Sequence, residues 1–333
     1  MVFMRHKLAP VFLLAGSAAL LLAGCGQATE RAGTTSGARK LNVVAAAYPF
    51  QFVAERVAGQ HGQVASLTQP GAEPHDLELT PQQTAEVIEA DLVVYEKTFQ
   101  AAVDGAVEQS GKDNALDTTT VVPLQDLGTE HDHQGEEHAE GAEHEGEEHA
   151  EGEEEHAEES GLDPHVWLDP TNMVTIGNAV AEKLGAVDPD RAADYVANAK
   201  ALETELTALD QEYADGLQNC DRTEFITSHE AFGYLARRYR LTQIGISGLS
   251  PDAEPSPARI AEVQTEAKEH GVTTIFYETL VSPDVAKSIA GDLGLKTDVL
   301  DPVEGITPES RGTDYLSVMR ANLTALTAAN GCR

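Results

Sequence analysis

Three histidines stand in loops from which their imidazoles could bind a metal ion. His75 lies in PGAEPHDLELTP, His165 in LDPHVWLDP and His229 in FITSHEAFGYLARRY. The first and third loops are predicted to join a strand to a helix, and the second precedes a long helical segment. Because open α/β sheets bind ligands beyond the carboxyl ends of their strands, the three imidazoles indicate one shared site rather than three solvated side chains.

A carboxylate would complete a four-coordinate metal site. The loop LDPVEGITP, after another predicted strand, offers Asp301 and Glu304. Three imidazoles and one carboxylate suit Zn²⁺, whereas Mg²⁺ or Ca²⁺ sites use oxygen ligands. His61 and His270 each precede glycine at a predicted helix end, where histidine interacts with the helix dipole. We interpret these two as structural.

One stretch of the chain, residues 131–160, combines histidine with glutamate and has almost no apolar residue. It is too polar to form a core and predicts a disordered loop over residues 129–161. Its imidazoles would bind Zn²⁺ weakly, and its carboxylates would concentrate cations nearby. The alternative is a solvated acidic insert with no metal role. The auxiliary ligands would be His131, His133, His138, His144, His149 and His156.

The N-terminus predicts export. A short basic region is followed by an apolar run that ends in LAGC at Cys25. This resembles the bacterial lipoprotein signal, so residues 1–25 are predicted to be a signal peptide with a lipidated Cys25, and residues 26–40 a flexible tether. An ordinary signal peptide with an incidental cysteine is the alternative. We expect an extracytoplasmic protein anchored to the bacterial cell membrane.

Charge and cysteine content narrow the function classes further. The net charge of −34 argues against nucleic-acid binding, which needs clustered Lys and Arg. Two cysteines remain after lipidation, and outside the cytoplasm Cys220 and Cys332 predict a disulfide. Two free thiols are the alternative. Neither cysteine has a His or second Cys beside it to form a metal site.

The elements that must position these residues alternate between strand and helix. In the first half, strands are predicted at residues 41–47, 63–68, 92–95 and 119–123, with helices between them. Helical segments follow at 170–184 and 189–217, and alternation resumes from residue 224. This pattern predicts two α/β lobes with parallel-rich sheets joined by one long helix. The domain boundaries would be an N-terminal lobe at 41–169, linking helices at 170–219 and a C-terminal lobe at 220–333.

The chain also resembles the zinc-type substrate-binding lipoproteins of ABC transporters, in the metal-binding cluster of solute-binding proteins. The resemblance covers most of residues 41–330 and rests on several motifs in order: PHDLELTP, DPHVWLDP, TSHEAFGYLARRY, LVSPDVAKSIA and LDPVEGITPESRGTDYLSVMRANL. It implies a rigid bridging helix and a metal in the cleft between the lobes. It also implies delivery of the ion to a membrane permease.

The resemblance places ligands at His75, His165 and His229. Relatives ending LNPLE use the glutamate that matches Glu304, whereas others use the residue matching Asp301, or a water. Asp301 precedes a proline, where a short side chain often bonds local amides. Glu304 reaches further and is followed by Gly305, which allows a tight turn. We therefore expect Glu304 to be the fourth ligand.

The functional prediction is a monomeric zinc-capture protein that is not an enzyme. The manganese branch of the family has glutamate where His229 stands, so His229 favours zinc over manganese. A zinc hydrolase would need an open coordination position and a base, and no HExxH motif is present. Uptake of manganese or another divalent metal, and surface adhesion with a zinc site, are the alternatives.

Overall fold

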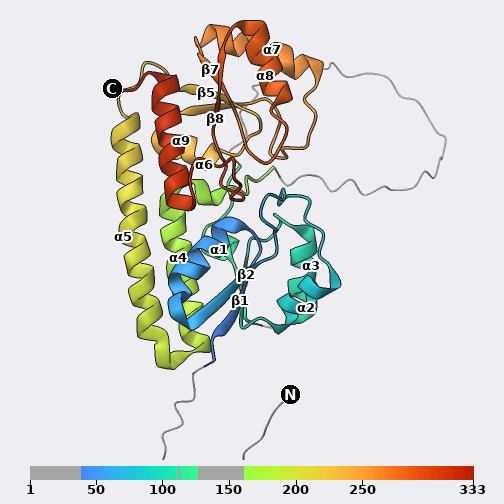
Figure 1. Cartoon of the computed structure of the whole chain (residues 1–333), viewed down its shortest axis with the longest axis vertical. Helices are drawn as coiled ribbons and strands as arrows, with labels where there is room; N and C mark the ends of the chain where they lie inside the picture. Colours follow the sequence, from blue (N-terminus) through green and yellow to red (C-terminus); the bar gives the residue numbers. More distant parts are fainter. Residues whose placement is uncertain (1–38, 112, 127–160) are drawn as a thin grey trace, which may run out of the picture. The chain divides into compact units, whose positions relative to one another are not determined.

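The computed structural model describes residues 39–111, 113–126 and 161–333. The first half of the chain forms a parallel sheet of four strands in the order β2-β1-β3-β4. The strands are β1 (Leu41–Ala45), β2 (Gly62–Ser66), β3 (Leu92–Tyr95) and β4 (Ala115–Asp117). The helices between them are α1 (Tyr48–Ala58), α2 (Pro81–Glu89) and α3 (Ala101–Ser110) (Figure 1).

The second half repeats this topology. Its four parallel strands have the order β6-β5-β7-β8. They are β5 (Glu224–Thr227), β6 (Thr242–Gly245), β7 (Thr274–Tyr277) and β8 (Lys296–Val299). The helices are α6 (Gly233–Tyr239), α7 (Pro257–Glu269), α8 (Asp284–Leu293) and the closing α9 (Tyr315–Asn330). The predicted fold class, two α/β lobes with parallel sheets, is confirmed.

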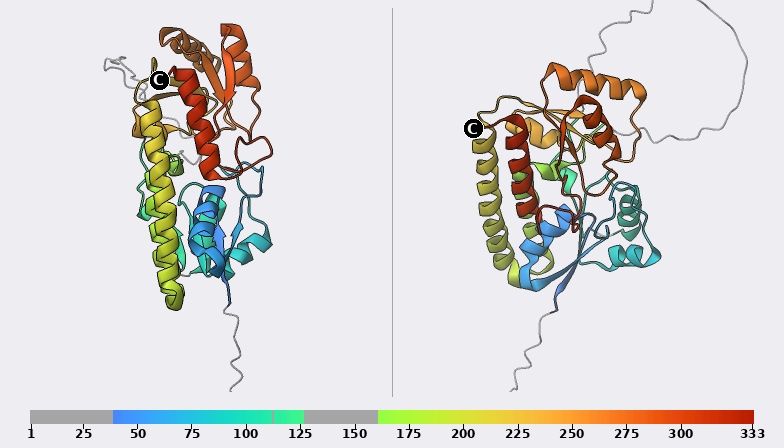
Figure 2. Two further views of the ribbon diagram at one scale, coloured as in Figure 1. Left: turned by 60° about the vertical axis from the view of Figure 1, so that its left-hand side comes forward. Right: turned by 45° about the horizontal axis from the view of Figure 1, so that its top comes forward.

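Two helices connect the sheets, α4 (Pro170–Val187) and α5 (Ala192–Leu217), which pack side by side (Figure 1). The 26-residue α5 contacts α1 of the first lobe and α9 of the second (Figure 2). Arg56 of α1 pairs with Glu205, and Arg320 Nε of α9 lies 2.8 Å from Glu212 Oε2. The helix is therefore attached to both lobes along its length, as the prediction of a long bridge requires.

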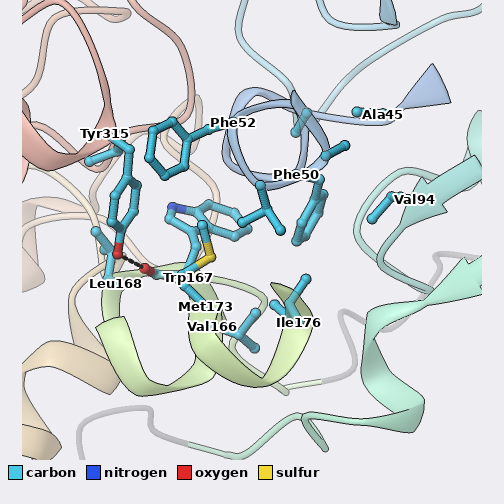
Figure 3. Close-up of a cluster of buried hydrophobic side chains, with 14 of the residues drawn as sticks. Ala45, Phe50, Phe52, Val94, Val166, Trp167, Leu168, Met173, Ile176 and Tyr315 are labelled. Atoms are coloured by element: carbon cyan, nitrogen blue, oxygen red, sulfur yellow. Dashed lines mark hydrogen bonds between the residues drawn. The ribbon is translucent and has the colours of Figure 1, made fainter. Parts of the chain in front are cut away.

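A shared core lies between the lobes. Phe52 of α1 stacks on Tyr315 of α9 with ring centroids 5.2 Å apart. Tyr315 donates a 2.6 Å hydrogen bond to the carbonyl of Trp167, and the fully buried Trp167 ring packs edge-on against Phe50 (Figure 3). Full burial of such side chains contributes roughly 2–3 kcal/mol each. Because this core crosses the predicted lobe boundaries, a division at residues 169 and 219 stays a prediction.

The predicted strand at residues 119–123 is wrong. The edge strand β4 lies earlier, where Ala115 and Leu116 pair with β3. Residues Thr118–Thr120 form a 3₁₀ helix instead, because the Asp117 side chain accepts the amide hydrogen of Thr119. By contrast, α2 begins as predicted, with Thr80 as the N-cap of a capping box and Pro81 at the first helical position.

Several sequence predictions lie outside the described residues. They are the signal peptide, the lipidated Cys25, most of the tether, and nearly all of the predicted loop at 129–161 with its six histidines. Among the described residues, no helix combines the length and the hydropathy that a membrane span requires.

Cys220 and Cys332 are joined by a disulfide in the structure, across a sequence separation of 112 residues. The amides of Asp221 and Arg222 also donate to the carbonyl of Asn330, so the same point links the start of β5 to the end of α9. We expect the exported protein to carry this disulfide. Closing a loop of this length stabilises the fold by roughly 3–5 kcal/mol. Mass spectrometry of non-reduced peptides measures it, and recovery of both cysteines as free thiols would contradict the pairing.

Candidate metal centre

The structure brings together four side chains from four separate loops. His75 follows β2, His229 follows β5 and Glu304 follows β8, whereas His165 directly precedes a 3₁₀ helix at Val166–Leu168. One donor atom of each side chain lies within 4.8 Å of those of the other three. The loops that follow parallel strands thus meet in one place, as open α/β sheets favour.

The Glu304 carboxylate lies at the centre of this cluster. Its Oε1 atom is 3.1 Å from Nε2 of His165, 3.4 Å from Nε2 of His75 and 3.7 Å from Nε2 of His229. His165, His229 and Glu304 are buried, whereas the His75 side chain is 13% exposed. The three imidazoles therefore present the same ring nitrogen to one buried carboxylate, and His75 is the member nearest to solvent.

Two further carboxylates fix the imidazole orientations. Asp163 Oδ1 lies 2.8 Å from Nδ1 of His165, and Glu278 Oε1 lies 2.7 Å from Nδ1 of His229. We assign the ring proton to Nδ1 in both, which leaves Nε2 to bind a metal ion, as in many metal-binding proteins. Neither residue was predicted as part of the site. The position of Glu278 directly after β7 was the available signal, since it stands at another strand end.

The two carboxylates considered as the fourth ligand, Asp301 and Glu304, lie in different surroundings. Asp301 Oδ1 accepts the amide hydrogen of Val303 at 2.8 Å, and its Oδ2 accepts the Ser310 hydroxyl at 2.9 Å. The Asp301 carboxylate thus forms hydrogen bonds within its own loop and lies outside the cluster. The chain bends at Glu304 and Gly305, as the sequence suggested, and Val303 just before them has a φ of 61°. A β-branched residue there is strained, and the Asp301 contact to its amide supports this conformation.

The charged groups of the cluster shift one another's pKa values. Burial disfavours a charged imidazole, but Glu278 and Glu304 outweigh it and raise the pKa of His229 to about 10. Likewise, Asp163 and Glu304 outweigh burial and raise the pKa of His165. Burial opposes ionisation of Glu304 too, yet the three histidines hold its pKa well below the ordinary value. A metal ion bound through Nε2 must displace the proton on that nitrogen, whereas the Nδ1 proton stays hydrogen-bonded to Asp163 or Glu278.

Two buried atoms of the cluster have no hydrogen-bond partner among the described residues: Nε2 of His229 and Oε2 of Glu304. Unsatisfied polar atoms are rare in protein interiors because each loses its solvation. A bound cation would satisfy both. A cavity of about 200 Å³, lined in part by His75, Phe99 and Leu162, lies beside the cluster on its more exposed side.

The donor set favours binding over catalysis. Three imidazole nitrogens and one carboxylate oxygen match four-coordinate Zn²⁺. Four protein donors are typical of closed zinc sites, whereas catalytic sites keep one position for water or substrate. The two histidines interpreted as structural lie elsewhere: His61 Nε2 is 2.8 Å from Asp194, and His270 ends α7 with Nδ1 3.6 Å from Glu224.

The chain matches known proteins along most of its length. Residues 43–329 match the family described as zinc-uptake complex component A, periplasmic. The chain is 36% identical over 328 residues to the high-affinity zinc uptake system protein ZnuA of Bacillus subtilis, covering 97% of this chain and 98% of that protein. It is 37% identical over 323 residues to the zinc-binding lipoprotein AdcA of Streptococcus pneumoniae, covering 94% of this chain but only 59% of AdcA.

A solved structure shows the same architecture. The Zn(II)-bound ZnuA-like domain of Streptococcus pneumoniae AdcA aligns with a TM-score of 0.69 at 33% identity, covering 87% of this chain and 99% of that domain. The bridged lobes and the buried donor cluster define a two-lobed solute-binding protein for a metal ion. The chain belongs to the ZnuA family of zinc-uptake components. The predicted family is thereby confirmed.

Proposed function

We propose that this protein captures Zn²⁺ outside the cytoplasm and delivers it to the permease of an ABC transporter. The observation that carries the proposal is the convergence of three Nε2 atoms on Glu304 Oε1 in a buried site. The ligands would be His75, His165, His229 and Glu304. The zinc-named relatives and the Zn(II)-bound neighbour support this choice of ion. The zinc-named family match does not favour the alternative of manganese uptake. Adhesion is a second candidate, because a similar structure is the laminin-binding protein Lmb of Streptococcus agalactiae, which is described as having adhesin and metal-transporting activity.

The cellular setting is part of the proposal. A lipid on Cys25 would anchor the protein to the membrane, and residues 26–40 would tether the binding unit near its permease. The AdcA relative is named a lipoprotein, which supports this arrangement. We further propose that the protein acts as a monomer, because one chain supplies all four donors. We also propose that it is not an enzyme, because four protein donors leave no coordination position for water or substrate.

One experiment tests capture directly. Purified protein, stripped of metal and titrated with Zn²⁺ against a chromogenic chelator, should show one tight site per chain. Mn²⁺ should compete poorly, because three imidazoles favour zinc. Cells that lack the protein should grow poorly under zinc limitation and recover when zinc is added. Absence of a tight stoichiometric site would overturn the proposal.

Deleting residues 130–160 should leave the tight zinc site intact and remove several weak ones. The proposed tight site draws every ligand from the described loops, whereas the histidines of this stretch would pay an ordering cost at each binding event. Calorimetry of the full chain and of the deletion variant measures both classes of site. Loss of the tight site on deletion would place one of its ligands within residues 130–160.

A further inference from the structure

We propose that Tyr234 positions His165 for zinc binding by holding together the two ends of the chain that flank residues 127–160. This inference rests on the proposed zinc site and adds a residue that does not touch the ion. Tyr234 belongs to α6 and is 4% exposed. Its hydroxyl accepts the amide hydrogen of Gln125 at 3.0 Å and donates to the carbonyl of Asp163 at 3.1 Å. One hydroxyl thus joins two backbone segments.

Those two segments also pair directly with each other. Gln125 and Asp163 form an isolated antiparallel bridge, and the Asp163 amide donates to the Gln125 carbonyl at 2.9 Å. Arg237, one turn further along α6, contacts the Gln125 side chain. The described chain stops at residue 126 and resumes at Gly161. Tyr234 and Arg237 therefore fix both flanks of the long insert against the second lobe.

Asp163 connects this bridge to the metal cluster, because its side chain contacts His165. Its Oδ1 atom accepts the backbone amide of His165 at 2.8 Å and lies 2.8 Å from Nδ1 of the ring. Movement of Asp163 would therefore turn the His165 imidazole and allow the other tautomer. Tyr234 also lies five residues after His229, so its hydroxyl connects the segments that carry two of the four proposed ligands.

The Tyr234 hydroxyl keeps its proton at neutral pH and can donate it to the Asp163 carbonyl. Burial raises its pKa well above the ordinary value, the hydrogen bond with Gln125 opposes this, and the nearby Asp163 charge adds to the rise. The phenol therefore stays protonated. Without it, the Asp163 carbonyl and the Gln125 amide would both lose the partner they have in the structure. The backbone bond between the two segments would then be the one from the Asp163 amide to the Gln125 carbonyl.

A matched tyrosine separates positioning from general stability. Tyr213 is fully buried, and its hydroxyl donates to the carbonyl of Met319 at 2.6 Å, away from the cluster. Tyr234→Phe and Tyr213→Phe each remove one buried hydroxyl. Both should lower the unfolding temperature of the metal-stripped protein. Only Tyr234→Phe should lower zinc affinity, by about tenfold, the range typical of residues that orient a metal ligand.

The test uses the full chain with two readouts. Zinc affinity comes from chelator competition, and ¹⁵N chemical shifts of the histidine rings report the His165 tautomer. In the zinc-loaded protein, Tyr234→Phe should shift His165 away from the pure Nδ1–H form, whereas Tyr213→Phe should not. Replacing residues 127–160 with a short Gly-Ser linker should restore most of the affinity lost in Tyr234→Phe, because the linker itself holds the flanks together.

Three results would overturn the inference. They are wild-type affinity and tautomer in Tyr234→Phe, an equal loss of affinity in Tyr213→Phe, and an undiminished effect of Tyr234→Phe after the linker replacement. Each differs from failure of the proposed function, in which the unmodified protein itself would lack a tight zinc site.

Discussion

Replacing His165 or His229 with alanine is expected to weaken zinc binding by a factor of about 10²–10³. A structural zinc site binds with roughly 10–16 kcal/mol shared among four ligands, which gives about 2.5–4 kcal/mol per ligand. Each substitution also leaves a buried carboxylate, Asp163 or Glu278, without its imidazole partner. His75→Ala removes a ligand as well and should weaken binding strongly.

Competition against a chromogenic chelator measures all three variants. His61→Ala and His270→Ala serve as controls, because these histidines pair with Asp194 and Glu224 outside the cluster. Both controls should keep wild-type affinity. A cluster variant that also kept wild-type affinity would show that its histidine is not a ligand.

Glu304→Gln is expected to weaken zinc binding far more than Asp301→Asn does. Glutamine keeps the shape of Glu304 but removes the charge to which three Nε2 atoms point. By contrast, asparagine at position 301 retains an oxygen that can accept the Val303 amide and keep the strained turn in place. We expect a loss of about tenfold or more for the first variant, and a small change for the second.

A crystal structure with zinc provides the direct measurement. The Glu304 carboxylate should lie within about 2.2 Å of the ion. Asp301 or a water molecule in that position would contradict the assignment, although zinc capture through the three histidines would survive. Thermal unfolding of Asp301→Asn serves as a control, since this variant is expected to alter loop stability more than metal affinity.

Much of the fold was predictable because local signals agreed with the tertiary structure. The apolar run Leu92–Tyr95 forms β3 with the predicted bounds, and the Thr80-Pro81 pair begins α2 as expected. The strand predicted at residues 119–123 does not form. Threonine and valine favour strands there, but an edge strand is set by pairing with its neighbour, and Ala115–Asp117 pairs with β3 instead. The position of a short edge strand is set by the neighbouring strand with which it pairs, and that strand lies elsewhere in the sequence.

The chemical identity of the site was likewise readable from the sequence. Imidazoles and carboxylates in loops after predicted strands indicate a zinc-type donor set whatever the details of packing, because the ends of parallel strands meet at one edge. The resemblance to known motifs then indicated which of the candidate residues are the ligands. Neither source pointed to Asp163, Glu278 or Tyr234, since each acts through another residue.

The sequence by itself determined which atoms are available to bind a metal and that they stand in loops of two α/β halves. Only the tertiary structure decided which of them face one another. His165 and Glu304 are separated by 139 residues, and His229 and Glu278 by 49. Such contacts depend on how the strands order within each sheet and on the buried aromatic core that holds the lobes together. The choice between Asp301 and Glu304 and the tautomers of the histidines follow from hydrogen bonds that exist only after these distant segments have packed.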